Sequence, residues 1–283
     1  MTTEEIRAFI EKETGFNVTV ENVEKNGLMK ESFIIHYDKS CDGDSSPQIS
    51  AVIPVEYIND DNVKYAVDSI KANHEDQVSV VGEFFETFND FEKCKDLLRI
   101  RISRHMDGSK KINIHHADLD IDEYVVIMFD TYSVNVGRKM VEKWGKEESY
   151  IFDLARKNSE KEFVRSFRDV MKGLASDIGV EDDEIDSLKD DFMLVVTNHQ
   201  NRFASRALLN NDLFKNTADN LNSDLIILPS SIDELLIVKD NGHDIDAYLD
   251  MVKQVNKTMP DNMILNEHVY KFSRDSMKVS IAA

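Results

Sequence analysis

The chain has 283 residues, about twice the usual domain size, so we expect two domains or one large one with a divided core. Its 54 acidic and 34 basic residues give a formal net charge of -20, which argues against direct binding to nucleic acid or to anionic membranes. The 41% hydrophobic content favours a folded protein, and the cysteines, Cys41 and Cys94, exclude a disulfide framework and a thiolate zinc site.

The first residues, MTTEEIRAFIEKETG, contain early glutamates and no long apolar run. We therefore expect neither a signal peptide nor a membrane anchor. Together with the low cysteine content, this predicts a cytoplasmic protein in a reducing compartment.

Residues 1–135 are predicted to form an α+β unit. Apolar residues at helical spacing predict a first helix that ends near Thr14, just before Gly15. Helical spacing also predicts two helices after it, one over residues 61–76 and one that carries Phe84, Phe85 and Phe88. Strands are expected wherever β-branched and aromatic residues gather or alternate with polar ones: Asn17 to Val23, Ser32 to Tyr37, Gln48 to Val55, Leu97 to Arg104, Lys111 to His115 and Tyr124 to Phe129.

Residues 136–191 are predicted to be a connector between two units. The pattern is helical over roughly 136–175, and eight acidic residues follow between Asp177 and Asp191 against one lysine. Such a composition is solvated more readily than it is packed, so this stretch is interpreted as a linker.

Residues 192–283 are predicted to form a ββαββαβ unit with a mostly antiparallel sheet, which makes the whole chain an α+β protein. The first strand, Phe192 to Thr197, is expected to form a hairpin with Phe203 to Leu209. The remaining elements follow as a helix from Asn211, strands Asp224 to Pro229 and Leu235 to Val238, a helix Asp244 to Lys257 and a strand His268 to Phe272.

Four residues are candidate contacts for a ligand or partner. His199 and Arg202 are predicted at the tip of the hairpin, where binding residues are often displayed, although turn propensity explains the neighbouring asparagines. Ser230 and Ser231 follow a buried strand, but they lack the flanking glycines of a nucleophile elbow, so capping of a turn is the favoured interpretation.

A second group gathers possible metal ligands within eight residues: His115, His116, Asp118, Asp120 and Asp122. It is not an EF-hand, because Glu123 and Phe129 occupy the positions of the required glycine and acidic residue. A polar loop between two strands explains the same residues, so we expect no catalytic residue, no metal site and no cofactor.

Several segments together resemble a bacterial family known as domain of unknown function 5688. The most specific are DLIILPSSIDELLIV (224–238), MVKQVNKT (251–258) and ILNEHVYKF (264–272), and weaker similarity extends upstream through MVEKWG (140–145) and residues 49–60 and 88–102. The resemblance implies a shared fold, is compatible with a mobile-element setting, and brings no activity and no catalytic residue with it.

The function predicted from the sequence is that of a non-enzymatic, protein-binding or regulatory factor, because no catalytic constellation is evident. Two alternatives stay open. Spaced carboxylates can imitate nucleic acid phosphates and so inhibit a nucleic-acid-binding enzyme. The second alternative is a hydrolase that uses Ser231 or a metal near His115.

Overall fold

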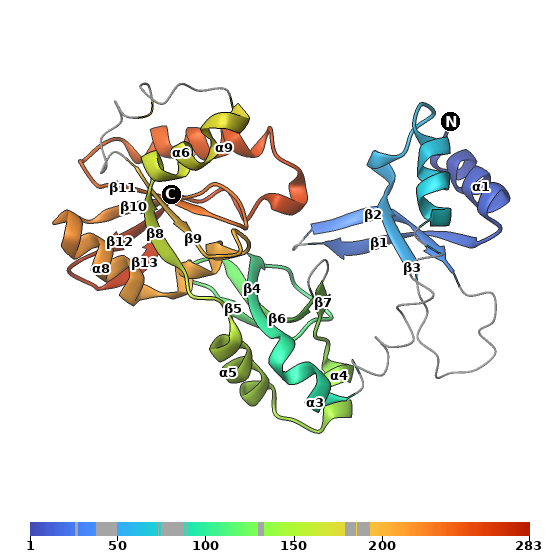
Figure 1. Ribbon diagram of the computed structural model, residues 1–283, viewed down its shortest axis with the longest axis horizontal. Coiled ribbons are helices and arrows are strands. Elements are labelled where there is room, and N and C mark those ends of the chain that lie inside the picture. The colour runs from blue at the N-terminus through green and yellow to red at the C-terminus, as the bar shows by residue number, and fades with distance from the viewer. Residues whose placement is uncertain are drawn as a thin grey trace. The chain divides into compact units, whose positions relative to one another are not determined.

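The computed structural model describes residues 1–25, 28–37, 50–72, 74, 88, 90–129, 133–178, 185 and 193–283 (Figure 1). It divides into two compact units. Unit 1 comprises Met1–Asp96 with Glu142–Gly145, and unit 2 comprises Leu97–Val141 with Lys146–Ala283. In the described part of the chain, no helix combines the length and the apolar character needed to cross a membrane.

Unit 1 begins with helix α1 (Thr3–Thr14), whose ends are set by local chemistry. The Thr2 hydroxyl accepts a hydrogen bond from the Glu5 amide, and the Glu5 carboxylate accepts one from the Thr2 amide, so two amides that lack helical partners are satisfied. Gly15 ends the helix at φ 72°, a left-handed conformation that favours glycine. The predicted end of the first helix is confirmed.

A three-stranded antiparallel sheet completes unit 1, in the order β1 (Asn17–Lys25), β2 (Leu28–His36), β3 (Ser50–Pro54). Its apolar face packs on α1 and on residues 63–72, which are helical. The three strands were predicted from their β-branched and aromatic residues, and the two helices from the helical spacing of their apolar residues. The expected helix with Phe84 and Phe85 lies outside the described residues, and the short elements η1 (Val55–Tyr57), α3 (Phe91–Cys94) and η2 (Lys95–Leu97) follow the sheet.

The first sheet of unit 2 has β6 (Ile121–Met128) at its centre, with all but its last residue buried. It pairs antiparallel with β4 (Leu98–Arg104), β5 (Asn113–His116) and β7 (Ser133–Asn135). Helix α4 (Arg138–Trp144), whose last three residues are assigned to unit 1, follows in the chain, and α5 (Glu148–Asn158) packs against β4 and β6. The apolar run in β6 thus indicated its central position correctly.

The second sheet of unit 2 has six antiparallel strands in the order β13-β12-β10-β11-β9-β8. They are β8 (Phe163–Ser166), β9 (Leu194–Thr197), β10 (Leu225–Pro229), β11 (Leu235–Lys239), β12 (Tyr270–Ser273) and β13 (Lys278–Ile281). Helices α8 (Asn211–Leu221) and α9 (Ile245–Asn256) cover opposite faces, because alternate residues of β10 enter two different core clusters. The predicted α+β class and mostly antiparallel sheet are confirmed.

Two predicted elements of unit 2 are wrong. The expected strand Phe203 to Leu209 is the 3-10 helix η3 (Ala204–Leu209); its buried residues Ala204, Ala207 and Leu208 recur at helical spacing, and Phe203 has a left-handed φ of 59°. Within the segment expected to be helical, Phe163–Ser166 forms strand β8 because it pairs with β9.

The remaining elements of unit 2 are helix α6 (Phe167–Ile178) and the short η4 (Asp261–Met263). Of the predicted acidic linker, 177–191, only residues 177, 178 and 185 are described.

Candidate functional site

Two polar clusters lie on opposite faces of strand β6. They are built on Asp122 and Glu123, which are consecutive and whose side chains therefore point to opposite sides of the sheet. Both carboxylates are almost completely buried, with exposures of 0% and 2%. Because a buried carboxylate is costly unless it is paired, each face must supply partners for it.

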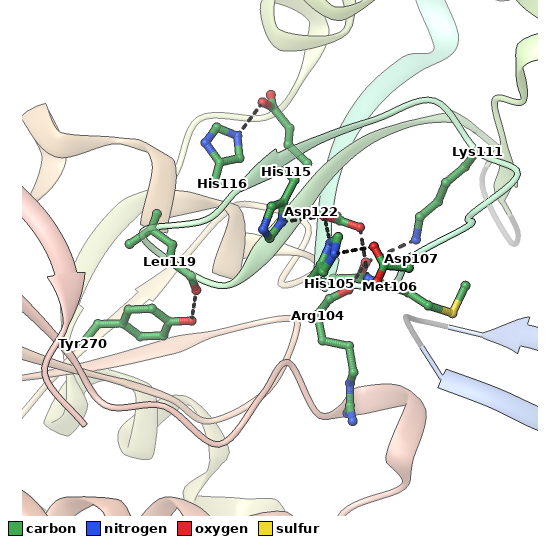
Figure 2. Close-up of polar contacts among 12 residues, drawn as sticks. Arg104, His105, Met106, Asp107, Lys111, His115, His116, Leu119, Asp122 and Tyr270 are labelled. Atoms are coloured by element: carbon green, nitrogen blue, oxygen red, sulfur yellow. Dashed lines mark hydrogen bonds and ion pairs between the residues drawn. The ribbon is translucent and has the colours of Figure 1, made fainter.

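On one face, two histidines converge on Asp122 (Figure 2). Nδ1 of His105 lies 2.8 Å and Nδ1 of His115 lies 3.1 Å from the same oxygen, Oδ1 of Asp122. His105 follows the last residue of β4, and His115 stands opposite Asp122 in the β5–β6 register. The two imidazole rings also lie in contact, tilted by 36° with centroids 3.8 Å apart. One potential ligand atom from each of these three side chains thus lies within 4.8 Å of the other two.

The residues around this cluster fix the orientation of its donor atoms. The Met106 amide donates to Oδ2 of Asp122 at 3.3 Å, which leaves Oδ1 facing the imidazoles. Nε2 of His105 lies 3.2 Å from the Asp107 carboxylate. The hydrogen bond with Asp122, followed by the weaker one with Asp107, raises the pKa of His105 above its ordinary value.

On the other face, Glu123 is held by Arg156 and His116. Nε and one terminal nitrogen of Arg156 donate to the two carboxylate oxygens, each at 2.8 Å, and Nε2 of His116 lies 3.1 Å from Oε2. Burial by itself would raise the pKa of Glu123, but the hydrogen bonds from Arg156 and His116 outweigh it, and the pKa is lowered. This two-point contact is the strongest geometry available to an arginine and a carboxylate.

A cleft of about 840 Å³ opens beside this second cluster, entirely within unit 2; we call it the basic cleft. Five basic and three acidic side chains line it: Arg156, Lys157, Lys161, Arg206 and Lys278 against Asp118, Glu123 and Glu162. Arg206 forms an ion pair with Glu162 and donates to the carbonyl oxygen of Glu160. The pKa of Glu162 is nevertheless raised, because the effect of burial outweighs the lowering by the positive charge of Arg206.

The four predicted contact residues do not form one site. The His199 ring packs on Phe163, and the Arg202 amide donates to the side chain of Asn198 in the turn after β9. Ser230 donates to the Glu234 carbonyl oxygen, and Ser231 accepts from the Asp233 amide, as turn residues do. In the described part of the chain, no hydrogen bond or ring contact joins His199 or Arg202 to either serine.

The five candidate ligands between His115 and Asp122 are distributed over several places. His115 reaches Asp122, whereas His116 points to the opposite face, Asp118 lines the basic cleft, and Asp120 pairs with His268 at 3.0 Å. Sequence reasoning missed His105 and Arg156, which are distant in the chain. The sequence offered one signal for such partners. Because consecutive side chains of a strand point to opposite faces, Asp122 and Glu123 in β6 must have two different sets of partners.

Comparison with known proteins identifies a family and nothing more specific. No curated protein and no solved structure matches the chain. A family model described as a family of unknown function matches residues 2–274 of the 283, so the resemblance seen in the sequence is confirmed. The chain belongs to this family, DUF5688.

Proposed function

We propose that this protein acts by binding rather than by catalysis, and that the basic cleft holds an anionic ligand. The observation that carries the proposal is a local reversal of charge. Acidic residues outnumber basic ones by 54 to 34 in the whole chain, yet basic side chains are the majority in the cleft. A concave surface that gathers charge of one sign concentrates ligands of the opposite sign.

The basic side chains of the cleft also differ in whether they form an ion pair with an acidic residue. The two arginines neutralise Glu123 and Glu162. Three exposed lysines, Lys157, Lys161 and Lys278, make no ion pair with any residue that the structure describes. They are therefore available to an incoming carboxylate or phosphate.

The start of helix α8 contributes further positive potential. Asn210 and Asn211 line the cleft, and Asn210 caps the helix by accepting a hydrogen bond from the Leu213 amide. The first amides of a helix carry a partial positive charge that favours anions. The volume of the cleft lies within the usual range for sites that bind small molecules.

The other functions expected from the sequence receive less support. Ser231, the candidate nucleophile, is engaged in a turn, which gives a serine hydrolase no support. Contact with a protein partner, a regulatory role and nucleic acid mimicry stay predictions, for which the described residues offer no specific surface.

Isothermal titration calorimetry on the full chain, with inorganic pyrophosphate and citrate as anion probes, tests the proposal. We expect saturable binding that weakens as salt is added and is lost when Lys157, Lys161 and Lys278 are changed together to glutamate. Changing the exposed Lys110 to glutamate serves as the control, because it alters net charge outside the cleft. Equal affinity in the triple variant and the wild type, or no binding of either probe, would contradict an anion site.

A further inference from the structure

We propose that His105, His115 and Asp122 bind a divalent transition-metal ion, on the face of β6 opposite the basic cleft. The proposal does not depend on the function proposed for the cleft, since the two sites share no side chain.

Two of the three spacings between donor atoms are close to those between ligands of one ion, and all three lie within 4.8 Å. Nδ1 of each histidine lies about as far from Oδ1 of Asp122, at 2.8 and 3.1 Å, as two ligand atoms of a tetrahedral zinc ion lie from each other, which is about 3.3 Å. Imidazole and carboxylate donors together suit zinc(II) and its neighbours in the first transition series. Magnesium and calcium, in contrast, prefer oxygen ligands alone.

The charge around Asp122 also calls for a cation. Its carboxylate is fully buried, and no lysine or arginine of the described chain forms an ion pair with it. Among the residues that the structure describes, its hydrogen bonds come from the two imidazoles and the Met106 amide. A divalent cation bound at Oδ1 would balance this buried negative charge.

The contacts beyond the three ligands match those of established metal sites. Histidines that bind metals usually hydrogen-bond through their other ring nitrogen to a carboxylate or carbonyl group. Nε2 of His105 makes such a contact with Asp107, which leaves Nδ1 for the ion. In the same way, the Met106 amide holds Oδ2 of Asp122, so that Oδ1 faces the two imidazoles.

The site is accessible and incomplete, as sites that exchange a ligand are. The side chains of His105 and His115 are 30% and 36% exposed, so an ion can enter from solvent. Three protein ligands leave at least one coordination position for water or another molecule, as in catalytic rather than structural zinc sites.

Zinc(II) titration of the full chain after treatment with a chelator, followed by calorimetry, tests the proposal, and cobalt(II) absorption reports the ligand set. We expect one equivalent of zinc to bind, and His105→Ala and His115→Ala each to weaken it more than about 100-fold, beyond the effect typical of residues behind the ligands. Asp107→Asn, which changes such a residue, is expected to weaken it about 10-fold.

Two controls separate loss of a ligand from general disturbance. His116→Ala alters the next residue of the same strand, whose ring lies on the opposite face, and His243→Ala removes an exposed histidine elsewhere in unit 2. Both should bind zinc as the wild type does, and circular dichroism should show that all variants fold. No zinc binding by the wild type, unchanged binding by His115→Ala, or equal loss in His116→Ala would each overturn the proposal.

Discussion

Removing Arg156 should destabilise unit 2 by leaving Glu123 charged and poorly paired inside the protein. Glu123 is 2% exposed and receives two hydrogen bonds of 2.8 Å from the guanidinium group. In an Arg156→Ala variant, His116 is the only charged or chargeable partner left to it among the described residues.

The expected loss follows from the burial of each partner. Breaking a buried ion pair by removing one member costs about 3–5 kcal/mol. The Arg156 side chain is 42% exposed, so water screens part of the interaction and can reach the space left behind. We therefore expect the free energy of unfolding to fall by about 2–3 kcal/mol, less than for a fully buried pair.

Urea unfolding followed by far-UV circular dichroism is the suitable assay, because the single tryptophan, Trp144, belongs to unit 1 and would not report on Glu123. Asp153→Asn is a matched control, since it removes an exposed partner of the same arginine. Such an exposed pair contributes within about 0.5 kcal/mol. A cost for Arg156→Ala no larger than that of the control would refute the reasoning.

The pH dependence gives a second check on the same pair. Because the folded pKa of Glu123 is lowered, the stability from its pairing is complete above the ordinary value of 4.5 and is lost as the pH falls through the folded pKa. The difference between the wild type and Arg156→Ala should therefore be largest near neutral pH and shrink below pH 4.5. A difference that is constant from pH 7 to about pH 3 would contradict a contribution from the Glu123 charge.

Two further predictions concern buried side chains. Tyr270→Phe should lower the free energy of unfolding by about 1–2 kcal/mol, because the buried hydroxyl donates to the Leu119 carbonyl oxygen and accepts from Asn266. Urea unfolding measures this change, with Tyr65→Phe as the control at an exposed tyrosine. An effect of Tyr270→Phe as small as that of the control would contradict the prediction. Burial, with a smaller contribution from Asp90, raises the pKa of Cys94 to about 11 from 9.0, which leaves about 100-fold less thiolate at pH 8. In a Cys41→Ser variant, a thiol reagent should thus react slowly with Cys94 in the native protein and rapidly after unfolding. Fast reaction of Cys94 in the native protein would contradict this prediction.

Local patterns in the sequence predicted much of the fold. The alternation in β4 identified that strand because burial of one face leaves a period of two residues. The apolar run of β6 identified a strand that is buried on both faces. The segment that forms η3 was misinterpreted, since its short apolar run fits either a strand or a helical turn. Strand β8 was missed because only its pairing with β9 makes it a strand.

The candidate sites could be predicted only in part. His115 and Asp122 were recognised as possible ligands because they lie close together in the chain. His105 was not, since its approach depends on the pairing of β4 with β6. Arg156 reaches Glu123 from a helix 33 residues further along the chain, and no local pattern records such a contact.

The adjacent acids of β6 make both candidate sites depend on a single strand register. Deleting the residue before Asp122 would move Glu123 into the place opposite the histidine pair and would carry Asp122 out of that place. Inserting one residue there would instead move Asp122 to the face of the guanidinium group and carry Glu123 away from it. A single shift of register in this strand would thus disrupt both sites at once, whereas side-chain substitutions can disrupt them separately. Natural variation in length within unit 2 should accordingly be confined to its loops.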